Sequence, residues 1–144
     1  MRFPPPEDAS GPGPWLCSEA EVTRLVETFY ARVRQDDLLA PIFDARVKDW
    51  AAHQSLLVAC WSALLRGTRR FHGAPVSRHL ELPGLTEQAF LRWLDLFRRT
   101  TAECGNEAMR READAAALRM ANHFWQRYQL RRISPGEPAP LPER

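Results

Sequence analysis

The positions of the prolines show where helices can form in this chain. Nine of the twelve prolines lie in residues 1–14 and 135–144, and only three interrupt the long stretch between them. Proline removes a backbone donor and breaks helix interiors, so the two ends offer little that could pack. We therefore predict flexible proline-rich tails over residues 1–15 and 133–144, on either side of one domain of residues 16–132.

Four segments of this domain carry apolar residues at the three- and four-residue spacing of amphipathic helices. The first follows Ser18, where the letters SEAE form a capping box, and we expect Pro41 to end it. The other three are expected from Asp49 to about Arg66, from Thr86 onwards, and from about Asn106 to Arg131. No segment alternates with period two for long enough to form a strand, so the predicted fold class is all-α.

Composition excludes several classes of protein. A length of 144 residues suits one domain, and a net charge of +2 gives no reason to expect nucleic-acid binding. The three cysteines include no C-x-x-C pair, which argues against a zinc ribbon and against haem attached through thioethers. Neither a signal peptide nor a membrane-length apolar run is present. We therefore expect a cytoplasmic protein with reduced thiols and no membrane partner.

One of the four histidines stands in an unusual place. His79 lies in the stretch APVSRHLELPG, between Pro75 and Pro83, in a segment too short to be a stable helix alone. Such a segment needs tertiary contacts or a ligand. His53 shares a helix face with apolar residues, and two histidines across a flat apolar slot can hold a haem. Residues that could line this slot are Phe29, Phe43, Leu57, Phe71, Leu82, Phe90 and Trp93. The alternative is that these side chains are simply core.

Four ordered segments carry a resemblance to a known family. LVETFYARVRQDDLLAPIF, DWAAHQSLLVACWSALLRG, FHGAPVSRHLELP and FLRWLDLFRRT together resemble the truncated haemoglobins of group III, over roughly residues 18 to 130. This resemblance implies a truncated globin fold and one non-covalent haem b. It implies that His79 is the iron ligand, that Phe43 packs on the haem face, and that Arg78 pairs with a haem propionate.

The same resemblance implies a ligand pocket on the other side of the haem. Tyr30, His53 and Trp93 would be its polar side chains, with Leu57 and Trp61 lining it. Each of the three offers an O–H or N–H, and an oxygen ligand carries partial negative charge. A hydrogen bond to a charged acceptor contributes about 1.5–3 kcal/mol. Two such donors would hold oxygen too long for a good carrier, which favours redox chemistry over transport.

Several reactions fit such a pocket, and the sequence does not choose among them. Oxygen with nitric oxide would give nitrate, and peroxide could use His53 as proton acceptor. Carbon monoxide could also bind, and so could sulfide or another small anion. Each redox reaction needs a reductase that the sequence does not identify. His53 or Tyr30 could instead close on the empty site. A haem-free helical interaction domain is the alternative from another class of protein, and a helical nucleic-acid-associated protein is the third.

Overall fold

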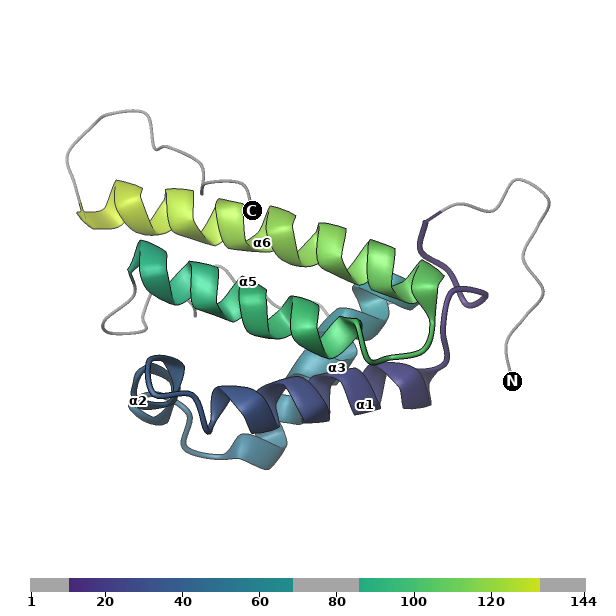
Figure 1. The fold of residues 1–144 in the computed structure, drawn as a ribbon, viewed down its shortest axis with the longest axis horizontal. Helices are drawn as coiled ribbons and strands as arrows, with labels where there is room; N and C mark the ends of the chain where they lie inside the picture. The colour runs from purple at the N-terminus through teal and green to yellow at the C-terminus, as the bar shows by residue number, and fades with distance from the viewer. Residues whose placement is uncertain (1–10, 69–85, 133–144) are drawn as a thin grey trace.

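The computed structural model describes residues 11–68 and 86–132. These two stretches form helices α1 (Glu19–Val33), α2 (Leu39–Asp44), α3 (Trp50–Arg66), α5 (Glu87–Thr101) and α6 (Glu107–Arg132). Neither stretch contains a strand, which confirms the all-α prediction. In Figure 1, α5 and α6 lie side by side and run in opposite directions, α1 lies along the other side of α5, and α3 crosses behind α1.

The predicted helix starts are confirmed. The Ser18 hydroxyl accepts the Glu21 N–H at 3.1 Å, and the Glu21 carboxylate accepts the Ser18 N–H at 2.9 Å, which is a complete capping box. The Asp49 carboxylate caps α3, and the Thr86 hydroxyl caps α5 by accepting the Ala89 N–H at 3.0 Å. These short-range bonds satisfy backbone donors that would otherwise lack partners, so local sequence alone can specify them.

The prediction that Pro41 ends the first helix is wrong. α1 already ends at Val33, and Pro41 lies inside α2. It occupies the first turn of that helix, where its missing N–H takes no intrahelical bond away. Asp36 starts this turn, because its carboxylate accepts the N–H groups of Leu38 and Leu39 at 3.1 and 2.9 Å.

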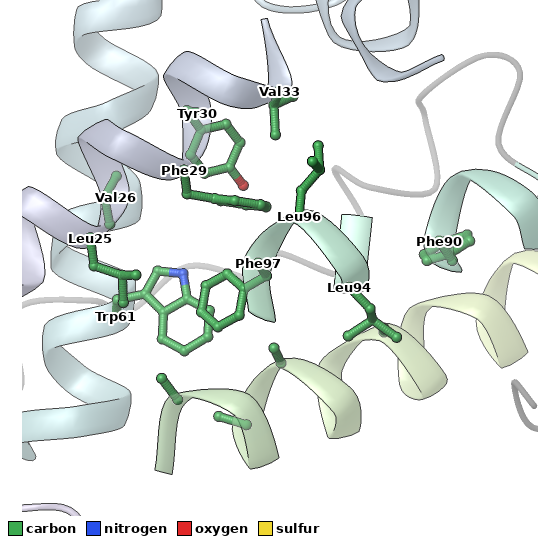
Figure 2. Close-up of a cluster of buried hydrophobic side chains, with 14 of the residues drawn as sticks. Leu25, Val26, Phe29, Tyr30, Val33, Trp61, Phe90, Leu94, Leu96 and Phe97 are labelled. Carbon is green, nitrogen blue, oxygen red and sulfur yellow. The ribbon is translucent and has the colours of Figure 1, made fainter. Parts of the chain in front are cut away.

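The core lies where α1, α3 and α5 meet. The Phe97 ring stacks between two indoles, with centroids 4.9 Å from Trp61 and 5.5 Å from Trp93. Phe29 of α1 meets the edge of this stack, 5.1 Å from Phe97 (Figure 2). α6 covers the core with small side chains, which let its backbone approach closely; these are Ala113, Ala116, Ala117 and Ala121.

Contacts between the chain and the helical domain begin before residue 16. The Gly13 N–H donates to the Leu65 carbonyl at 3.0 Å, and Trp15 packs against the core. This end of the predicted N-terminal tail is therefore held against the domain. Most of that tail and the whole C-terminal tail lie outside the described residues. None of the helices that the structure describes is both long enough and apolar enough to cross a membrane.

Candidate functional site

Tyr30 lies at the centre of the candidate site. Its side chain is 1% exposed on α1, and the indole of Trp93 on α5 is hydrogen-bonded to its hydroxyl. Since an indole can only donate, the Tyr30 oxygen accepts this bond and keeps its own proton for another partner. Burial raises the pKa of the Tyr30 hydroxyl far above its ordinary value, and the bond from Trp93 offsets only part of that rise. Tyr30 is therefore a neutral donor at any physiological pH.

His53 approaches the same tyrosine from α3. Its ring centroid is 5.7 Å from that of Tyr30, and the two rings are perpendicular at 89°. His53 is half-buried, with its Nε2 atom inside the protein. The structure thus brings together the three polar side chains that the sequence predicted, from three different helices, with Tyr30 in contact with both His53 and Trp93.

Aromatic and aliphatic side chains surround these polar groups. The ring centroid of Phe29 lies 4.7 Å from that of Tyr30 and 5.3 Å from that of Trp93. The ring centroid of Phe43 lies 6.0 Å from that of Tyr30. Leu57 packs against the core but is only partly buried. A few hydrogen-bonding groups in an otherwise apolar wall suit a flat apolar ligand that carries a small polar molecule. The residues present therefore fit a haem.

Two of the predicted pocket residues lie deeper or farther away. Trp61 is 1% exposed and stacks on Phe97 within the core. The ring centroid of Phe90 lies 5.5 Å from that of Trp125 on α6. Figure 2 shows Phe90 apart from Phe29 and Tyr30. For both residues, contact with a haem stays a prediction.

The predicted iron side of the site falls on residues outside the described stretches. These are Phe71, Arg78, His79 and Leu82. Iron coordination by His79 therefore stays a prediction from the sequence. Among the described residues, no three histidine, cysteine, aspartate or glutamate side chains gather in a way that could hold a metal ion.

One aromatic residue at this site was not predicted from the sequence. Trp50, the first residue of α3, has its ring centroid 5.6 Å from His53, 6.2 Å from Tyr30 and 6.4 Å from Phe43. The guanidinium carbon of Arg34 also lies 4.7 Å from the Trp50 ring centroid. The sequence signal was the spacing of three residues between Trp50 and His53, which puts both on one helix face.

Cys60 is a further buried group near the site. Its side chain is 6% exposed on α3, and burial raises the pKa of its thiol. The thiol is thus protonated at neutral pH and packs as a small apolar group.

Comparison with known proteins gives concordant matches. The sequence model of the bacterial-like globins matches residues 16–126. The chain is 31% identical over 111 residues to the group 3 truncated hemoglobin ctb of Campylobacter jejuni, which covers 74% of this chain and 87% of that protein. It is also similar to the crystal structure of a group III truncated hemoglobin from Campylobacter jejuni, with a TM-score of 0.70 and 28% identity. That match covers 86% of this chain and 92% of the other.

Proposed function

Because the chain belongs to the bacterial-like globin family, we propose that it binds one non-covalent haem b and, on it, a small ligand. The family implies haem binding and a truncated globin fold. One observation of this structure carries the proposal further: Tyr30, His53 and Trp93 meet inside a wall formed by Phe29 and Phe43. Buried hydrogen-bond donors in such a wall suit a small polar ligand that is itself bound to a flat apolar group.

Particular residues would hold the haem. His79 would bind the iron, Arg78 would pair with a propionate, and Phe43 would pack on the porphyrin face. The other side chains that we assign to the haem surroundings are Phe29, Leu57, Trp61, Phe71, Leu82 and Phe90. When bound, haem would supply an iron atom that takes oxygen, nitric oxide, carbon monoxide or a small anion such as sulfide.

The polar side chains would act on that small ligand. Tyr30 donates its O–H, because its oxygen already accepts from Trp93 and its proton is not lost to water. His53 adds an N–H in one tautomer, or accepts a proton where the ligand is a peroxide. Trp93 orients the tyrosine and completes the wall. These donors would slow release of a ligand that carries partial negative charge.

Slow release favours chemistry over transport. We propose redox turnover, either oxidation of nitric oxide by oxygen to nitrate or a peroxidase-like reaction, with an unidentified reductase returning electrons and the cytoplasm as its site. Mixing the oxygenated protein rapidly with nitric oxide tests the first reaction. Stoichiometric nitrate within one turnover supports it, and unchanged nitric oxide contradicts it.

Haem binding itself has a direct test. The purified protein should be red, and its Soret band should shift when carbon monoxide is added after reduction. His79→Leu removes the nitrogen proposed as the permanent protein ligand of the iron, so this variant should lose haem or change its coordination. His123→Leu, at an exposed position on α6, is the matched control and should keep the wild-type spectrum.

A colourless protein that takes up no added haemin would overturn the proposal. A haem-free helical interaction domain would then be the better assignment, with the aromatic cluster acting as core only. Haem binding with an unchanged spectrum in His79→Leu would overturn the assignment of the iron ligand and leave the rest standing.

A further inference from the structure

Trp50 occupies a fixed position at the edge of the candidate site. Asp49 caps α3 by accepting the Ala52 N–H at 3.1 Å, so the start of this helix is set by a side-chain bond. Trp50 follows as the first helical residue and is half-buried against the core. Its ring therefore enters the site from a defined point, next to the turn of helix that carries His53.

The imidazole of His53 packs against two aromatic rings, whose own centroids are 6.2 Å apart. Trp50 meets it at 5.6 Å and 90°, and Tyr30 meets it at 5.7 Å and 89°. Both contacts are edge-to-face arrangements, which aromatic rings prefer over flat stacking. Tyr30 comes from α1 and Trp50 from the same helix as His53, so rings from two helices pack on the imidazole and limit its rotation.

Arg34 lies over the ring of Trp50. This residue caps the C-terminal end of α1, and its guanidinium carbon lies 4.7 Å from the Trp50 ring centroid, within the range of a cation–π contact. The arginine is exposed. This contact joins the end of α1 to the tryptophan at the start of α3.

We propose that Trp50 is a positioning residue for His53, that it keeps the imidazole turned towards Tyr30, and that Arg34 holds Trp50 in that position. This inference rests on the proposed function, because His53 must act on a haem ligand for its orientation to affect kinetics. The positioning role of Trp50 differs from a purely structural role in what it predicts. A residue that only fills the core changes stability, whereas a positioning residue changes ligand kinetics through the side chain it positions.

The test uses the haem-loaded protein and the oxygen dissociation rate. Trp50→Leu should raise this rate about two- to tenfold, the range expected when one aromatic contact is lost. Trp50→Phe keeps an aromatic edge and should restore most of the wild-type rate. In a His53→Leu background, Trp50→Leu should have no further effect, because the side chain through which it acts is gone. An equal effect in both backgrounds overturns the proposal.

Exposed Arg34 gives a second variant that spares the core. Arg34→Gln should raise the rate in the same direction but by less, and Arg34→Lys should restore it, since both cations attract an aromatic face. The matched control is Arg24→Gln, which removes an exposed arginine from the same helix and should leave the rate unchanged. A rate that Arg34→Gln leaves unchanged overturns the role of the arginine.

A readout independent of oxygen separates this inference from the proposed function. In protein with nitrogen-15-labelled histidine, the His53 imidazole signals should shift and broaden in Trp50→Leu, and His123 signals should not. Unchanged His53 signals overturn the positioning role whether or not haem binds. Failure to take up haem with a shifted His53 signal overturns the proposed function and leaves the contact between Trp50 and His53 supported.

Discussion

The indole N–H of Trp93 on α5 donates to the hydroxyl of Tyr30 on α1. This bond links two helices across the buried site and uses the tyrosine oxygen as an acceptor, which leaves its O–H free of Trp93. The phenolic proton is left to point at something else. Trp93 therefore helps to set the direction in which the Tyr30 hydroxyl donates.

Tyr30→Phe tests the donor directly. The substitution removes one hydroxyl and keeps the ring contacts with Phe29 and Phe43, so the pocket should keep its shape. Losing a hydrogen bond to a charged acceptor, about 1.5–3 kcal/mol, should raise the oxygen dissociation rate roughly ten- to a hundredfold. Stopped-flow displacement of oxygen by carbon monoxide measures it. Tyr128→Phe on α6 is the control, and an unchanged rate in Tyr30→Phe would remove Tyr30 from the ligand site.

Trp93→Phe tests whether the indole acts on the ligand or through the tyrosine. A phenylalanine can still stack on Phe97 but has no N–H to offer Tyr30. A neutral hydrogen bond contributes about 0.5–1.5 kcal/mol, so the oxygen dissociation rate should rise about two- to tenfold. In a Tyr30→Phe background the same change should add almost nothing. Additive effects on the rate would mean that Trp93 donates to the ligand itself, which is the role that the sequence suggested.

Phe97→Ala tests the core beneath the site. The phenylalanine is 1% exposed and stacks between Trp61 and Trp93. Its truncation should lower the free energy of unfolding by about 3–5 kcal/mol, because the lost contacts leave a cavity between two indoles. Urea unfolding followed by circular dichroism measures this. Leu91→Ala, at a half-buried position of the same helix, should lower the free energy of unfolding by clearly less. Equal losses at the two positions would contradict a core centred on Phe97.

Much of the fold was predictable because its determinants are local. The capping residues Ser18, Asp49 and Thr86 act within three residues of their own positions, and helical spacing marked the buried faces. Pro41 was misread for the opposite reason. A proline can end one helix or lie in the first turn of the next, depending on where the earlier helix stops. Here Asp36 starts a new turn before Pro41, so the proline falls in the second helix.

The site was predictable in its polar part and less so in its neighbours. Tyr30, His53 and Trp93 were found through resemblance to a family, and the structure brings them together. Trp50 was missed because its contacts with Tyr30 and Phe43 join three helices, and no local pattern encodes such a meeting. An aromatic at the first position of a helix is more often a surface or packing residue, so only its spacing from His53 hinted at the site.

Asp114 links α5 to α6 and gives the fold a pH dependence. Its carboxylate accepts the Thr101 O–H at 2.7 Å, but burial raises the pKa of Asp114 above its ordinary value despite this bond and the nearby Arg110. The folded protein thus binds this proton more tightly than the unfolded chain. The charged carboxylate therefore weakens the fold as the pH rises from the unfolded pKa, about 3.9, through the folded pKa.

Asp114→Asn, which can still accept from Thr101, should remove this loss. The difference in unfolding free energy between variant and wild type, from urea titrations between pH 4 and 8, should grow with pH and then level off. A difference that shrinks as pH rises would reverse the sign and show that the ionised form is the one the fold prefers.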